Sequence, residues 1–278
     1  MSEHSDRPAR MISPDQGSIP AYIEEVWANR DLVAFLVWRD IKVRYRQTFF
    51  GAAWAVVPPF FTMVVFTLIF GTLVKVASDG QPYWAFSICA LTAWNYFSQA
   101  LTNAANSAIN NASLIEKVYF PRLSLPLSAI VSPLLDLAIA LALLVPVLAI
   151  AGIMPSARLP LLVPLIAMAL ATALGLGAIL AALNVRYRDV RHLVPLLLQL
   201  GLFATPVVYP ASLVPEGLRP LLGLNPMAGV VEGFRWVLLG SATDPWPLVG
   251  VSTVTALVLL ACGIVVFMRL ERGFADLI

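Results

Sequence analysis

Long stretches without a charged side chain constrain this sequence more than any other feature. No Asp, Glu, Lys or Arg occurs between Arg46 and Lys75, and a second uncharged stretch runs from Gly80 to Ile115. Charged residues make up 12% of the chain, about half of the roughly 25% in a typical soluble domain. Apolar stretches longer than about 18 residues are typical of membrane spans. The sequence therefore argues against a large soluble protein and predicts an all-α membrane protein.

Six segments are apolar enough to be interpreted as membrane spans. We expect them at about Gly51–Val74, Tyr83–Asn106, Leu123–Ile150, Leu159–Asn184, Leu193–Tyr209 and Trp246–Met268. A hydrocarbon core of about 30 Å requires about 20 helical residues at 1.5 Å each. Because the number of spans is even, both termini are expected on the same side of the membrane.

Lys and Arg are distributed unequally between the two sides of this arrangement. Of the 18 basic residues, only Lys75, Arg158, Arg219 and Arg235 fall on the side away from the termini or at its span ends. Basic residues accumulate in the cytoplasmic loops of membrane proteins. Both termini are therefore predicted to be cytoplasmic.

The segment before the first span is predicted to lie at the cytoplasmic membrane surface. Residues 1–19 are polar and are expected to form a flexible tail, and residues 20–50 are expected to form an amphipathic helix in the headgroup layer. Apolar residues recur there at helical spacing beside a set of basic residues. The basic residues are Arg39, Lys42, Arg44 and Arg46. The alternative is a charge cluster that only sets the orientation of the chain.

Asp136 interrupts the third predicted span. A charge at bilayer depth is costly. Three interpretations remain open, namely a polar lining group, an interhelical hydrogen-bonding site and a structural carboxylate that faces another helix.

The segment Val207–Gly240, between the fifth and sixth spans, is rich in proline and too broken to cross a membrane. Proline interrupts helices, so the segment is expected to form re-entrant or interfacial half-helices on the external side. Glu232 and Arg235 are three residues apart and are expected to pair. The functional interpretation is an external gate, and the alternative is a decorated external loop. The candidate gate residues are Pro210, Pro215, Glu232 and Arg235.

Aromatic residues gather near predicted span ends and in the proline-rich segment Val207–Gly240. Such residues are usually bilayer anchors, but aromatic rings also stack on the apolar faces of sugars. The candidates for a channel lining are Trp84, Trp94, Tyr96, Phe97, Phe203 and Tyr209.

Motifs for enzymatic chemistry are missing from the sequence. It contains no G-x-x-x-x-G-K-[ST] loop, no H-E-x-x-H and no G-x-S-x-G, and its two histidines are His4 and His192. We assign no catalytic, metal-binding or cofactor-binding residue to this chain. If the protein uses ATP and Mg²⁺, a partner subunit has to bind them.

Five blocks of the sequence, in order, resemble the ABC-2 type permeases, and specifically their polysaccharide-export branch. The blocks are Arg39–Gly71, Asn111–Leu137, Leu183–Pro210, Leu224–Gly240 and Arg269–Ile278. The resemblance implies a six-span domain over residues 51–278. It also implies a homodimer in the bacterial inner membrane, assembled with two copies of an ABC ATPase subunit.

The resemblance further implies export of a lipid-linked polysaccharide such as O-antigen, capsular polysaccharide or teichoic acid. The basic residues before the first span would then contact either the pyrophosphate linker of the substrate or anionic lipid headgroups. Membrane lipids are expected partners, and nucleic acid is not. The alternatives are an ABC-2 exporter of a drug or small lipid and a membrane-embedded lipid-carrier transferase.

The resemblance also places a coupling helix for the ATPase in the loop after the second span. The residues that it implicates are Ser113, Leu114, Ile115, Glu116, Lys117, Val118, Tyr119 and Phe120. Five of them are apolar and are expected to be exposed in a charged loop, which is typical of a binding face.

Overall fold

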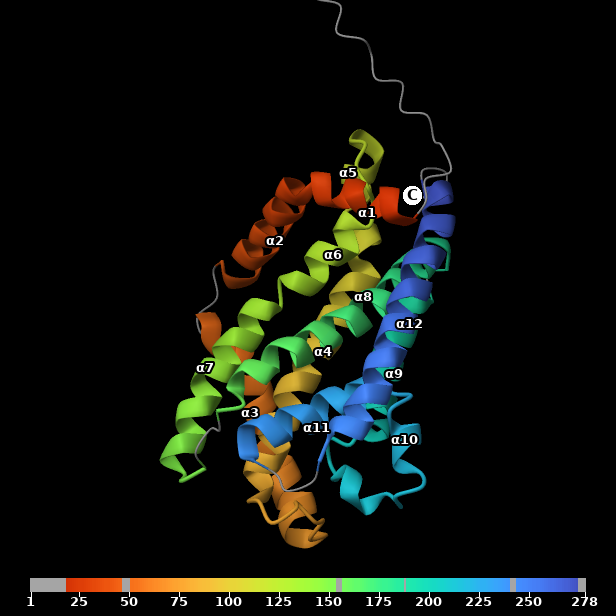
Figure 1. Ribbon diagram of the computed structural model, residues 1–278. Helices are drawn as coiled ribbons and strands as arrows, with labels where there is room; N and C mark the ends of the chain where they lie inside the picture. The colour runs from red at the N-terminus through yellow and green to blue at the C-terminus, as the bar shows by residue number, and fades with distance from the viewer. Residues whose placement is uncertain (1–18, 47–50, 154–156, 188, 241–243, 275–278) are drawn as a thin grey trace, which may run out of the picture.

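The computed structural model describes residues 19–46, 51–153, 157–187, 189–240 and 244–274. The predicted tail up to residue 18, and residues 47–50 of the predicted interfacial helix, lie outside the described residues. The described chain is helical and contains no strand (Figure 1). The prediction of an all-α protein is confirmed.

Four helical segments among the described residues are long and apolar enough to cross a membrane. They are Ala53–Leu73, Ser124–Ile150, Leu159–Arg186 and Trp246–Leu270. They match the first, third, fourth and sixth predicted spans. Helix α4 (Tyr83–Asn110), at the second predicted span, is 28 residues long but more polar than these four segments. Helix α9 (Val190–Ala204), at the fifth, has 15 residues, which gives about 22 Å at 1.5 Å per residue.

The first spanning segment changes its helical form along its length. It consists of a 3₁₀ turn (Gly51–Ala55), helix α3 (Val57–Phe66) and a π-helix (Thr67–Leu73). The segment Ser124–Ile150, which matches the third predicted span, is divided at Pro133. Its two parts are α6 (Ser124–Val131) and α7 (Leu134–Ile150). Proline removes a backbone donor and disrupts the helical hydrogen bonding there.

Helix α8 (Leu162–Arg186) packs between α4 and α12 (Trp246–Leu270). Small residues allow the close approach. A Cβ atom added to Gly177 would lie 2.6 Å from the Cβ of Ala104, and one added to Gly263 would lie 2.2 Å from the carbonyl oxygen of Gly175. Small residues at helix contacts are typical of membrane bundles, because backbone packing replaces the hydrophobic effect there.

The two ends of the bundle differ (Figure 1). At one end, α1 (Ile19–Ala28), α2 (Arg30–Tyr45) and α5 (Ala112–Lys117) lie near the end of α12. The single helix predicted over residues 20–50 is thus two helices that meet at Asn29, whose side chain donates to the carbonyl of Glu25 at 2.8 Å. At the other end lie α10 (Arg219–Leu222) and α11 (Pro226–Leu239), beside the start of α4.

Candidate functional site

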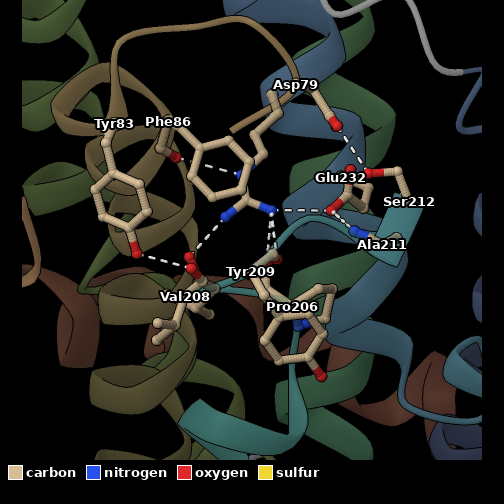
Figure 2. A network of polar contacts seen from close by, with 11 residues as sticks. Asp79, Tyr83, Phe86, Pro206, Val208, Tyr209, Ala211, Ser212 and Glu232 are labelled. Carbon is tan, nitrogen blue, oxygen red and sulfur yellow. Dashed lines mark hydrogen bonds and ion pairs between the residues drawn. The ribbon is translucent and has the colours of Figure 1, made fainter. Parts of the chain in front are cut away.

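Arg235 on α11 is a buried cation with an exposed fraction of only 1%. Its guanidinium group donates to the carbonyl oxygens of Pro206 at 2.5 Å, Val207 at 2.6 Å and Phe86 at 3.2 Å (Figure 2). It also lies 3.5 Å from the centre of the Phe86 ring. Five N–H donors in a rigid plane allow arginine to satisfy several acceptors at once. We call Arg235, Glu232 and the groups that they bind the Arg235 clasp.

Glu232 balances the charge of Arg235 within the clasp. Its Oε1 atom lies 2.9 Å from the Arg235 Nη1 atom and accepts a hydrogen bond from the Ala211 amide at 3.1 Å (Figure 2). The pairing predicted from the spacing of the two residues is therefore confirmed. Glu232 is itself buried, so neither charge is left uncompensated away from solvent.

The clasp holds an irregular segment that follows α9, residues 205–211, which we call the outer segment. Backbone carbonyls in a buried, non-helical segment need partners, because no water is there to replace the missing helical bonds. Arg235 supplies donors to three of its residues, and the Tyr83 hydroxyl donates to the Val208 carbonyl at 2.7 Å (Figure 2). The outer segment is thus joined to both α11 and α4.

The sequence around α11 sets the position of Arg235. The side chain of Asn225 caps the helix by accepting from the Met227 amide at 3.1 Å, and Pro226 occupies the first turn. The same Asn225 donates to the Thr205 hydroxyl at 2.8 Å. Helix α11 ends at Leu239, and the next residue, Gly240, has a φ of 67°, which favours glycine. One residue therefore caps α11 and fixes the start of the outer segment.

The four candidate gate residues are only partly brought together. Glu232 and Arg235 form the centre of the clasp, and buried Pro210 precedes the short helix Ala211–Leu213 next to it. Pro215 is exposed on the following loop and does not contribute to the clasp. Phe86 is a member of the clasp that the sequence did not reveal, because it is 149 residues away from Arg235.

The candidate channel aromatics fall into two groups. Trp94, Tyr96 and Phe97 are buried in the hydrophobic core of the chain, and the Tyr96 hydroxyl donates to the Ile130 carbonyl at 3.2 Å. Trp94 packs against Gly201 on α9, and the Phe97 ring lies 5.5 Å from the Trp94 ring, so these three rings face neighbouring protein groups within the described chain. The others retain exposed surface, namely Trp84, Phe203 and Tyr209.

The expected exposure of the α5 region also needs correction. Ile115 and Phe120 are buried in a cluster with Phe267 and Phe274 from the end of the chain. Leu114 is half-buried. The exposed residues are Ser113, Glu116, Lys117, Val118 and Tyr119. The apolar residues of this loop thus serve two purposes, since some anchor it to the bundle and others remain on the surface.

Polar contacts join α1, the segment that follows α5 and the end of α12, and the Leu123 amide donates to the Tyr22 hydroxyl at 3.4 Å. The Tyr22 hydroxyl donates to the Glu271 carboxylate at 2.6 Å. Burial and the charge of Glu271 raise the pKa of the Tyr22 phenol well above its usual value, so it remains a donor at neutral pH. Arg122 donates to the backbone carbonyl of Glu271 and lies 5.6 Å from the Phe274 ring centre. We call Tyr22, Arg122, Glu271 and Phe274 the end junction.

The four basic residues of the predicted interfacial segment have different surroundings. Arg39 pairs with neighbouring Asp40 at 2.8 Å, and Arg44 pairs with Asp136. Lys42 and Arg46 are exposed. Asp136 on α7 thus bonds to residues of α2. This agrees with the interpretation of Asp136 as an interhelical hydrogen-bonding site.

A set of polar residues on α4 was not recognised in the sequence. Asn95, Gln99, Thr102 and Asn106 recur every three or four residues, which places them on one face of the helix. We call this face the polar stripe. At one end of the stripe, Asn106 accepts a hydrogen bond from the Asn184 amide of α8 at 3.1 Å. The spacing alone predicts the stripe, and these residues also explain why α4 is less apolar than the other long helices.

The helical bundle, its apolar spanning segments and its buried ion pairs define a multi-pass membrane protein. Residues 31–239 match the model of the family described as ABC-2 type transporter. The chain belongs to this family, whose members are the membrane components of transport systems.

Relatives with assigned names extend the comparison over nearly the whole chain. An O-antigen export system permease protein, RfbA, of Myxococcus xanthus is 32% identical over 257 residues, which cover 91% of this chain and 98% of the relative. RfbA of Klebsiella pneumoniae is 27% identical over 249 residues, which cover 89% and 95%. The resemblance to polysaccharide-export permeases is thereby confirmed.

Proposed function

We propose that this chain is the membrane subunit of an ATP-driven exporter that moves a lipid-linked polysaccharide of the O-antigen type across the bacterial inner membrane. The observation that carries the proposal is the similarity to two O-antigen export permeases over at least 95% of their length. The chain has no G-x-x-x-x-G-K-[ST] loop, so ATP is hydrolysed by a separate ATPase subunit. The working assembly contains two copies of each subunit.

In this proposal the chain crosses the membrane six times, with both termini in the cytoplasm. The 28 residues of α4 give about 42 Å of helix at 1.5 Å each, enough for a core of about 30 Å. Helix α9 and the outer segment together make the fifth crossing. The Arg235 clasp then lies toward the external side and acts as a gate, since it holds irregular backbone closed through hydrogen bonds that can exchange for others.

The ATPase acts at the opposite end of the bundle. It contacts the exposed residues of the α5 region, among them Glu116, Lys117 and Tyr119. The end junction links this region to α1 and to α12, and α12 packs tightly on α8. Closure of the two ATPase subunits therefore moves these helices together rather than α5 alone.

Deletion of the gene in the host tests the proposal. We expect surface polysaccharide to be lost and lipid-linked glycan to accumulate inside the cell, and we expect the intact gene to restore both. A drug or small-lipid exporter would leave surface polysaccharide unchanged. A lipid-carrier transferase would instead leave no completed lipid-linked glycan to accumulate, and either result would reject the proposal.

A further inference from the structure

A small cavity with both polar and apolar walls lies between the end of α2, the start of the first span, α4 and α7, away from the Arg235 clasp. Its volume is about 220 Å³. The cavity is lined by Gly51 and Ala55 and by five residues with larger side chains, namely Arg44, Tyr45, Trp54, Gln99 and Asp136. At about 30 Å³ per water molecule in the liquid, this is room for about seven waters or for one sugar ring. We call it the Asp136 cavity.

The charged groups in the wall of the cavity, Arg44 and Asp136, balance each other. The Asp136 carboxylate accepts hydrogen bonds from both the Arg44 guanidinium and the Tyr45 hydroxyl. A phosphate placed here would have to share Arg44 with a carboxylate, which repels it. An uncharged group that carries hydroxyls meets no such cost and satisfies the polar walls. The charge balance therefore favours a neutral hydroxylated ligand over a pyrophosphate.

The walls of the cavity offer groups that suit a sugar. Gln99 is exposed and makes no hydrogen bond within the described part of the chain, so its amide offers two donors and an acceptor. Trp54 is 51% exposed, and an indole ring is a flat surface for the apolar face of a sugar. The Asp136 carboxylate keeps acceptor capacity beyond its two bonds.

The polar stripe on α4 leads into the cavity through Gln99. One turn earlier on the stripe, the amide nitrogen of Asn95 is buried and has no hydrogen-bond partner among the described residues. An unsatisfied buried donor costs about 1–3 kcal/mol. Thr102 and Asn106 are hydrogen-bonded within the bundle, so Asn95 and Gln99 are the members of the stripe that offer polar groups near the cavity.

We propose that the Asp136 cavity binds one uncharged sugar unit of the exported glycan, with Gln99 and Asp136 bonding its hydroxyls and Trp54 stacking on its ring. This inference rests on the proposed function, because the polysaccharide supplies the ligand. Gln99 and Trp54 then act as glycan-contacting residues, whereas Arg44 and Tyr45 position Asp136.

Binding to the permease–ATPase complex in lipid nanodiscs tests the inference. The probe is the lipid-free oligosaccharide released by mild acid from the host's own surface polysaccharide, and saturation-transfer NMR titration measures its binding. We expect Gln99→Leu and Trp54→Leu to weaken binding at least tenfold without lowering the thermal unfolding temperature. The matched controls are Gln199→Leu on α9 and Trp246→Leu on α12, which change exposed residues outside the cavity and should bind as the unmodified complex does.

Several outcomes would overturn the inference. One is binding by Gln99→Leu and Trp54→Leu within twofold of the unmodified complex, and another is no binding by the unmodified complex at all. Displacement of the oligosaccharide by inorganic phosphate would show an anion site instead. Failure of the proposed function is distinguishable, since it appears in the gene deletion as unchanged surface polysaccharide, whereas these results concern the cavity alone.

Discussion

Replacing Arg235 with methionine should destabilise the protein strongly, because the change leaves the polar groups of the clasp buried without their donor. Removing one partner of a buried ion pair costs about 3–5 kcal/mol. The carbonyls of Phe86, Pro206 and Val207 also lose a donor, at about 1–3 kcal/mol for each buried group left unsatisfied. These costs overlap and do not add, so we expect a loss of about 4 kcal/mol.

Thermal unfolding of the purified protein in detergent, followed by chromatography of the heated samples, measures the effect. At about 2–4 °C per kcal/mol for a chain of comparable size, Arg235→Met should lower Tm by about 8–16 °C. Arg235→Lys should recover only part of the loss, because a single ammonium group cannot reach acceptors on all sides. Glu232→Gln should lower Tm less, since its carboxamide oxygen still accepts from the Ala211 amide.

A matched control separates burial from the chemistry of the substitution. The side chain of Glu216 is 90% exposed and lies 3.8 Å from Arg219, and such exposed pairs contribute about 0–1 kcal/mol. Glu216→Gln should therefore leave Tm unchanged within about 1 °C. If the Tm of Arg235→Met lies within 2 °C of the Tm of the unmodified protein, the clasp does not stabilise the outer segment.

Two further changes test the packing of the bundle and the end junction. Gly263→Ala places a methyl group against the Gly175 carbonyl and should cost about 1–3 kcal/mol through overpacking. The control Gly250→Ala also lies in α12, but its methyl group would meet no neighbouring atom, so it should not lower the unfolding temperature, because alanine favours the helix over glycine. Equal unfolding temperatures for the two variants would disprove the close contact. Tyr22→Phe removes the donor to Glu271. The free energy of unfolding should fall by about 1.5–3 kcal/mol, as for a hydrogen bond to a charged group. The amount of glycan exported per ATP hydrolysed should also fall, and an unchanged ratio would exclude the end junction from coupling.

Local sequence patterns predicted part of this structure correctly. The apolar segments and the pairing of Glu232 with Arg235 depend on neighbouring residues along a helix, so spacing and hydropathy were sufficient. The polar stripe on α4 has the same local origin and was predictable from the spacing of Asn95, Gln99, Thr102 and Asn106.

Contacts between distant segments were not predictable from the sequence. Ile115 and Phe120 are apolar residues in a loop, and their burial depends on Phe267 and Phe274 at the other end of the chain. The acceptors of Arg235 on the outer segment and at Phe86 likewise depend on how α4, α9 and α11 meet. Nothing in the local pattern around Trp94 distinguishes a ring that packs on Gly201 from one that faces a channel.

Transport by purified components tests the central claim most directly. Vesicles would contain this chain, its ATPase partner and the lipid-linked glycan of the host, and an added glycosidase would report glycan that reaches the opposite side. We expect ATP to drive the glycan across only when both proteins are present, and we expect an ATPase subunit unable to hydrolyse ATP to abolish the movement. Crossing without the ATPase subunit, or no crossing with both proteins and ATP, would contradict the account.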